Sequence, residues 1–227
     1  MQEISSQLQQ VLCRIALACD QVARKQDEVQ LLAVSKRQSI EAIVAVYEAG
    51  QHDFGENYVQ EALQKIQLLA HLPLTWHLIG ALQSNKTAEV AQHFAWVHSV
   101  DRFKIAQRLS QQRPQHLPPL NICVQVNIDN QDTKSGCQIS ELPDLVKAIL
   151  PLPNVVLRGL MIIPQAQNHE AFTQLAQIRQ QLLGTIPALN SQVFDTLSMG
   201  MSDDLEQAIA AGSTMVRVGT AIFGQRT

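Results

Sequence analysis

The stretch FDTLSMGMSDDLEQAIAAGSTMVRVG, residues 194–219, contains a complete strand–helix–strand unit. Its first part, FDTLSMG, is a short apolar strand that ends at a glycine. Ser202 is expected to cap the following helix, in which Asp203 and Asp204 suit the positive end of the helix dipole. TMVRVG, residues 214–219, then returns as a second apolar strand. Strands that alternate with helices in this way indicate a parallel sheet with crossover connections.

The rest of the chain repeats this unit. Strands are expected at residues 31–35, 52–55, 74–80, 96–100, 120–128, 154–163, 194–200 and 214–219. Helices are expected between them at residues 40–50, 57–70, 85–94, 101–112, 139–150, 169–184 and 202–212. Apolar residues that recur every three or four positions predict a further helix within residues 1–27, packed on the outside of the other elements.

The count of eight strands and the length of 227 residues predict one α/β domain over residues 1–227, a (β/α)8 barrel of the TIM type with an extra N-terminal helix. An open doubly wound sheet is the alternative. Such a sheet usually has a glycine-rich first turn, and here the first turn is SKRQS, which contains no glycine.

The composition argues against several classes of partner. The net charge is −3 and the chain has only two Trp and two Tyr, whereas nucleic-acid binding favours a basic face and aromatic platforms. Four cysteines without a CxxC pair indicate free thiols in a reducing cytosol rather than a metal site. No apolar run reaches the length of a membrane span, and the N-terminus lacks a signal-peptide pattern. We therefore expect a cytoplasmic protein without metal, membrane or nucleic-acid partners.

In barrels of this type the active site lies at the C-terminal ends of the strands, and the loops after strands 7 and 8 commonly bind phosphate. Here those loops are SMGMS, residues 198–202, and VGT, residues 218–220. Each offers a glycine and a hydroxyl, and backbone N–H groups in such loops can hold a phosphate dianion. The alternative is that both glycines only make tight turns. GALQSNK, residues 80–86, does not qualify as a P-loop, because Asn85 stands where the second glycine is needed.

LLAVSK, residues 31–36, ends an apolar strand on a lysine. Lys36 could extend its charged head to water, or its amine could condense with a carbonyl. Once the barrel closes, strand 1 lies beside the two phosphate loops, so a ligand with an aldehyde and a phosphate would bridge them. Pyridoxal 5′-phosphate is such a ligand, and Arg217 on strand 8 could meet its pyridine nitrogen. For His77 and Tyr58 a packing role is the alternative to a place in the site.

Several stretches also resemble the pyridoxal phosphate homeostasis protein family, in register from about Leu31 to Arg226. The matching motifs are AVSK, FGENYVQEALQKI, WHLIGALQSNK, SVDR, QVNI with KSGC, LRGLM and SMGMSDDLEQAIAAGSTMVRVGTAIFG. Only Ala81 and Ile162 depart from the expected pattern, at positions that should not alter how a ligand is anchored. The resemblance implies the barrel of the alanine racemase N-terminal domain, which is fold type III among pyridoxal phosphate proteins.

The resemblance also implies site residues and a role. Lys36 carries the cofactor as a Schiff base, Arg217 faces the pyridine nitrogen, and Asn57 and His77 lie near the ring. The phosphate ligands implied are Ser198, Met199, Gly200, Gly219 and Thr220. The family is thought to bind, buffer and hand over pyridoxal phosphate, with effects on amino-acid and keto-acid balance. We accordingly expect no catalytic residues, transient contacts with apo-enzymes that use the cofactor, and a monomer.

Two enzymatic alternatives stay open. One is a racemase or decarboxylase that uses Lys36 as its base. We expect the barrel to use up the chain, so that no second domain supplies the opposing acid–base residue that a racemase needs. An arginine opposite the pyridine nitrogen would also weaken the ring as an electron sink. The other alternative is a Schiff-base aldolase without a cofactor.

Overall fold

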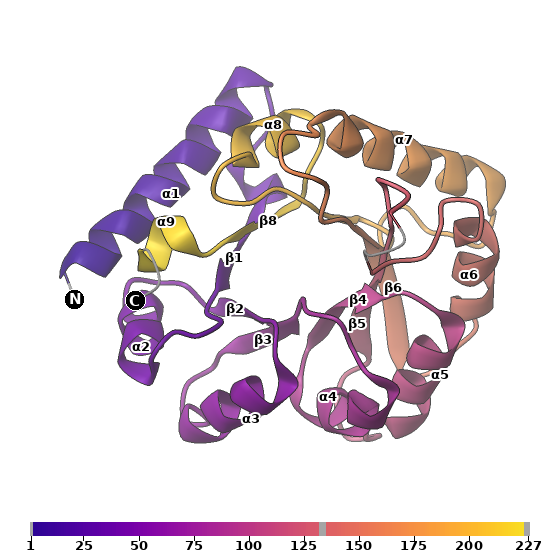
Figure 1. Ribbon diagram of the computed structural model, residues 1–227, viewed down its shortest axis with the longest axis horizontal. Coiled ribbons are helices and arrows are strands. Elements are labelled where there is room, and N and C mark those ends of the chain that lie inside the picture. The colour runs from indigo at the N-terminus through magenta and orange to yellow at the C-terminus, as the bar shows by residue number, and fades with distance from the viewer. Residues whose placement is uncertain (1, 132–134, 225–227) are drawn as a thin grey trace.

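Eight parallel strands close into a barrel in chain order, with β8 pairing back onto β1 (Figure 1). The computed structural model describes residues 2–131 and 135–224. The strands are β1 (Gln30–Val34), β2 (Asp53–Glu56), β3 (Thr75–Leu78), β4 (Trp96–Val100), β5 (Leu120–Gln125), β6 (Val155–Met161), β7 (Thr196–Ser198) and β8 (Met215–Val218). The predicted barrel is thus confirmed, and the doubly wound alternative was wrong.

The helices surround the strands, as Figure 1 shows. They are α1 (Gln2–Gln21), α2 (Ile40–Glu48), α3 (Val59–Leu68), α4 (Thr87–His93), α5 (Phe103–Gln112), α6 (Leu142–Ile149), α7 (Glu170–Thr185), α8 (Leu205–Ala210) and α9 (Thr220–Phe223), with 3-10 turns η1 (Gln26–Glu28) and η2 (Ser84–Lys86). Ser39 caps α2, since its side chain accepts a hydrogen bond from the Ala42 N–H.

The start of α8 differs from the expectation. The helix begins at Leu205, and Asp204 rather than Ser202 is its N-cap residue. The Asp204 carboxylate accepts the Met201 N–H at 2.6 Å, which closes a turn before the helix. The Ser202 hydroxyl instead accepts the Ala221 N–H at 3.4 Å. Ser202 therefore joins the loop after β7 to α9.

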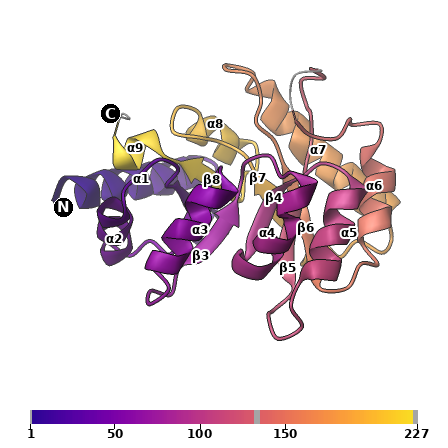
Figure 2. The ribbon, with the colours of Figure 1, turned by 60° about the horizontal axis from the view of Figure 1, so that its bottom comes forward.

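The N-terminal helix packs on the outside of the barrel, as expected, against α2, α8 and α9 (Figure 2). It ends at Gln21, earlier than the expected residue 27, and η1 leads into β1. Arg14 of α1 forms an ion pair with Glu206 at 2.7 Å and donates to the Ser202 carbonyl at 2.9 Å. Helix α1 thereby holds the loop after β7 from the outside of the barrel.

Apolar side chains fill two regions. The larger lies between the strands and the helices, where the apolar faces of both are buried. The smaller lies inside the barrel and consists of Leu32, Val34, Ile79, Trp96, Cys123, Met161 and Met215. Polar side chains complete this interior, and the fully buried ones include His77, His98 and Ser198. A barrel interior is ordinarily filled by branched apolar residues, so these polar groups need an explanation.

Three further observations bear on the sequence expectations. Within the described part of the chain, no helix is long and apolar enough to cross a membrane. Lys134, the first residue of the KSGC motif, lies outside the described residues. The four cysteines are free thiols.

Candidate binding site at the mouth of the barrel

A cavity of about 240 Å³ opens at the C-terminal ends of the strands. Five of the nine predicted site residues line it, namely Lys36, Asn57, Arg217, Gly219 and Thr220. Ile79, Ile163 and Met201 add apolar surface. A pocket with an apolar lining and a few convergent polar groups is typical of small-molecule sites.

Strand pairing brings Lys36 beside the last loop of the barrel. In the β1–β8 ladder Leu32 pairs with Arg217 and Ala33 with Val218, so both strands end at the same level. A Cβ atom added to Gly219 would lie 3.2 Å from the Val34 carbonyl oxygen, so the turn after β8 packs directly on the end of β1. Lys36 and Gly219, which are far apart in the sequence, therefore lie at the same end of the barrel on neighbouring strands.

The backbone before Lys36 is held by charged residues that the sequence analysis did not identify. Lys65 of α3 donates to the Ser35 carbonyl at 2.7 Å, to Glu56 at 2.8 Å and to Glu61 at 2.6 Å. The Ser35 hydroxyl also donates to Glu56 at 2.6 Å. Spacing of Glu61 and Lys65 by four residues on one helix was the available signal.

Burial raises the pKa of the Glu56 carboxyl above its usual value, against the opposing effect of Lys65 and Ser35. The Oε2 atom of Glu56 is buried and has no hydrogen-bond partner among the described residues. The same is true of the Asn57 Oδ1 atom, on a residue that lines the cavity. A buried polar atom without a partner is costly, and a ligand with a donor group could satisfy the Asn57 oxygen.

The loop after β7 has a shape that requires glycine. Gly200 has a φ of +92°, and a Cβ atom there would lie 2.5 Å from the Ala208 Cβ atom of α8. The loop can therefore pack closely on α8 only with glycine at this position. Ser202 and Thr220 both line the cavity, so the loops after β7 and β8 meet at its wall, as predicted.

Met199 lies in the barrel wall rather than in the cavity lining. Its side chain belongs to the core between strands and helices, and its N–H donates to the Met215 carbonyl at 3.1 Å. The Met199 carbonyl accepts the Ser213 hydroxyl at 2.7 Å. Its assignment as a phosphate ligand stays a prediction that none of these contacts supports.

His77 and Ser198 lie deeper, inside the barrel, where both are fully buried. The Ser198 hydroxyl lies 2.9 Å from an Arg217 Nη1 donor and 2.9 Å from the His98 Nδ1 atom. His77 stacks on Trp96 with ring centroids 5.4 Å apart. These two predicted residues therefore connect to the cavity through Arg217. His98 was missed, because a single histidine in the strand WVHSV gives no signal of its own.

Arg217 is the charged group at the floor of the cavity. It donates to the Ser198 hydroxyl and, at 2.8 Å, to the Ile162 carbonyl, and burial lowers the pKa of its guanidinium to about 10. Arg217 is therefore still protonated at neutral pH. Within the described residues no group of His, Cys, Asp and Glu could hold a metal ion.

The fold and the site define a barrel protein whose mouth combines a lysine with two glycine-containing loops. The sequence from residue 12 to 227 matches the family model "Alanine racemase, N-terminal domain". Solved alanine racemases confirm the fold: the Clostridium difficile enzyme superposes with a TM-score of 0.76 at 13% identity, over all of this chain and 57% of that chain. At this identity the likeness concerns the fold alone.

Curated relatives identify the family more closely. The pyridoxal phosphate homeostasis proteins of Pseudomonas aeruginosa and Escherichia coli K12 are 53% and 48% identical to all of this chain, over 97% and 98% of their own lengths. The chain belongs to the pyridoxal phosphate homeostasis protein family. PipY of Synechococcus elongatus, a structure with PLP bound, is 38% identical over 92% of this chain and all of that chain, with a TM-score of 0.80.

Proposed function

We propose that the protein binds pyridoxal phosphate at the mouth of the barrel, through a Schiff base on Lys36, and takes part in its intracellular homeostasis. The observation that carries the proposal is the meeting of Lys36, Arg217 and the two glycine-containing loops in one cavity. The relatives named above and the PLP-bound PipY structure support it.

The residues present fit the cofactor. The Lys36 amine would condense with the aldehyde, with loss of one water molecule. The loops that contain Gly200 and Gly219 would receive the phosphate, and the Ser202 and Thr220 hydroxyls line the same wall. The unsatisfied Asn57 oxygen could accept a hydrogen bond from the ring substituents.

Arg217 supports a role in carrying the cofactor rather than in catalysis. When bound, the cofactor can act as an electron sink, and it does so best when its ring nitrogen is protonated. A guanidinium has only donors, so a charged Arg217 next to that nitrogen would keep it unprotonated. A racemase or decarboxylase that uses Lys36 as its base would therefore have to work with a weaker electron sink.

The attachment is tested by reducing the loaded protein with borohydride and locating the adduct by mass spectrometry. We expect the pyridoxyl mass on Lys36 and its loss in Lys36→Ala. Lys86→Ala is the matched control, because Lys86 follows β3 in η2 and pairs with Glu89 outside the cavity. An unlabelled Lys36 in the wild type, or an adduct that disappears equally in the control, would contradict the proposal.

Hand-over is tested by mixing the loaded protein with an apo-enzyme that requires pyridoxal phosphate. Activity should recover faster than the free cofactor leaves the protein, because transient contact between the two proteins would transfer it directly. Recovery no faster than spontaneous release would remove direct delivery from the proposal and leave buffering.

The enzymatic alternative is tested with the loaded protein and the two alanine enantiomers. We expect no interconversion above a Lys36→Ala background. Turnover at an ordinary enzymatic rate, on the order of 10 s⁻¹, would overturn the carrier assignment.

A further inference from the structure

A continuous chain of hydrogen bonds crosses the interior of the barrel. It begins at Asp53, the first residue of β2, whose carboxylate lies 3.0 Å from His77 Nε2. His77 Nδ1 lies 3.0 Å from His98 Nε2, and His98 Nδ1 lies 2.9 Å from the Ser198 hydroxyl. Arg217 completes the chain through its bond to Ser198. It therefore joins a carboxylate at the N-terminal end of the barrel to the cation at the floor of the cavity.

The proton positions along this chain follow from its last member. Arg217 can only donate, so the Ser198 oxygen accepts that bond, which leaves the single Ser198 proton free to be donated to His98 Nδ1. His98 then carries its proton on Nε2 and donates to His77 Nδ1. His77 in turn carries its proton on Nε2 and donates to Asp53. Both histidines are thus neutral Nε2–H tautomers, and all donors point from the arginine to the carboxylate.

The opposite direction would require either an additional proton or a repulsive contact at Asp53. If His98 Nδ1 donated to Ser198, His98 Nε2 would have to accept a proton from His77 Nδ1. His77 would then be a cation, or it would turn a lone pair toward the Asp53 carboxylate. Full burial lowers the pKa of both His77 and His98, which favours the neutral arrangement.

We infer that Asp53, His77, His98 and Ser198 are positioning residues for ligand binding, which fix the guanidinium of Arg217 so that its remaining N–H groups face the cavity. The chain is anchored at both ends by opposite charges, and Ile162 holds the guanidinium from the other side. Aligned hydrogen bonds of this kind strengthen one another in a buried setting. The inference deepens the proposed function and rests on it for the identity of the ligand.

The position of Asp53 allows an experiment to separate this role from ordinary core packing. Asp53 is 22% exposed at its side chain and stands at the N-terminal end of a strand, away from the cavity lining. A packing role would make its loss a matter of stability alone. A positioning role makes its loss visible in the ligand, at the other end of the barrel.

The first test uses the ligand-free protein, so its outcome does not depend on the proposed function. Long-range ¹H–¹⁵N NMR distinguishes the two histidine tautomers and the cation, with assignments from His77→Gln and His98→Gln. We expect neutral Nε2–H tautomers for both residues at pH 7. An Nδ1–H tautomer at His98, or a cation at either position, would overturn the inference.

The second test breaks the chain of hydrogen bonds at Asp53, its end farthest from the cavity. Asp53→Leu removes the acceptor, whereas Asp53→Asn keeps an acceptor oxygen and serves as the conservative rescue. We expect Asp53→Leu to weaken pyridoxal phosphate binding roughly tenfold, the scale of one hydrogen bond between a charged and a neutral group. The absorption spectrum of the bound cofactor should also shift, and Asp53→Asn should restore most of both.

Asp195→Leu is the matched control, because Asp195 precedes β7 at the same end of the barrel but bonds to Arg158. Its loss should leave the cofactor affinity and spectrum unchanged. A folded Asp53→Leu variant with wild-type affinity and spectrum would refute the positioning role. If the wild type itself binds no pyridoxal phosphate, the proposed function fails, and the NMR result alone decides whether the chain is directional.

Discussion

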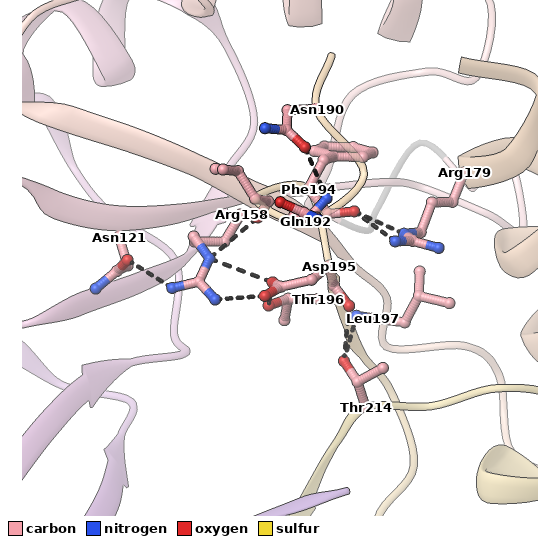
Figure 3. Close-up of polar contacts among 11 residues, drawn as sticks. Asn121, Arg158, Arg179, Asn190, Gln192, Phe194, Asp195, Thr196, Leu197 and Thr214 are labelled. Atoms are coloured by element: carbon pink, nitrogen blue, oxygen red, sulfur yellow. Dashed lines mark hydrogen bonds and ion pairs between the residues drawn. The ribbon is translucent and has the colours of Figure 1, made fainter. Parts of the chain in front are cut away.

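The two ends of the barrel hold an arginine in different ways. At the N-terminal end, Arg158 of β6 bonds to Asp195 at 2.6 Å and to Asn121 at 3.1 Å (Figure 3). Its guanidinium also lies 5.0 Å from the Trp96 ring centroid. At the mouth, the described hydrogen bonds of Arg217 go to a hydroxyl and a carbonyl. Arg158 is thus paired with a carboxylate, whereas the described hydrogen bonds of Arg217 include none to a carboxylate.

Cavity size alone would favour the N-terminal end over the proposed site. The cavity beside Arg158 and Asp195 has a volume of about 380 Å³, against about 240 Å³ at the mouth. Beside it, polar side chains bond to other groups of the protein, as Arg158 does to Asp195 and Arg179 does to the Phe194 carbonyl (Figure 3). The comparison teaches that a binding site is marked by groups whose charge and hydrogen-bonding capacity are not fully used within the protein.

The largest expected effect comes from the charged cluster behind Lys36. Lys65→Met would leave Glu56, which is fully buried, without its cation, and removing one partner of a buried pair costs about 3–5 kcal/mol. Chemical denaturation measures the loss in free energy of unfolding. The double variant Glu56→Gln/Lys65→Met should recover part of it. A loss in Lys65→Met no greater than that in Arg158→Met would erase the contrast between the two ends.

The histidines between the two ends should make the protein acid-sensitive. His77 and His98 have folded-state pKa values below the usual 6.5, so the unfolded chain binds protons first as the pH falls. Stability is then fully present above pH 6.5 and is lost below it, by up to about 1.4 kcal/mol per pH unit for each histidine.

Glu56 acts in the opposite direction, because its raised pKa makes stability fall as the pH rises above 4.5. The histidine contribution is therefore measured as the difference between the wild type and His98→Gln in denaturation curves from pH 7.5 to 5. The variant should show the shallower dependence. Equal slopes in both proteins would mean that His98 is not held neutral.

A smaller effect is expected at the N-terminal end. Arg158→Met removes a partly exposed ion pair and a cation–π contact, which together contribute about 1–2 kcal/mol. These contacts lie at the N-terminal end of the barrel, away from the cavity at the mouth. Affinity for pyridoxal phosphate should therefore not change. Equilibrium titration monitored by absorbance is the measurement. A tenfold loss of affinity would show that Arg158 itself is coupled to the mouth.

The smallest effect is expected at the rim. Tyr58 is 48% exposed, and its ring lies 5.7 Å from the Arg37 guanidinium. Tyr58→Leu should cost about 0.5 kcal/mol in the free energy of unfolding, as for an exposed cation–π pair. Cofactor affinity measured in the same titration should stay within about threefold, because a change of 0.5 kcal/mol corresponds to roughly that factor. A larger loss would place Tyr58 in the site.

Sequence periodicity determined the barrel, because eight apolar strands separated by amphipathic helices can bury their surfaces in few other ways. It also placed Lys36, Arg217 and the two glycine loops at one end, since all strands in a parallel barrel end there. Helix ends were less well determined. Helix α8 begins at Leu205 with Asp204 as its N-cap residue, and the Ser202 hydroxyl accepts the Ala221 N–H instead of capping the helix.

Only the tertiary structure decided which polar residues inside the barrel bond to one another. No local pattern relates Asp53, His77, His98 and Ser198, since they come from four different strands and meet only when the barrel closes. The same holds for Lys65, whose role depends on Ser35 and Glu56 in other elements. Periodicity records which face of an element is buried, whereas hydrogen-bond partners are set by distances of about 3 Å between elements that the sequence does not encode locally.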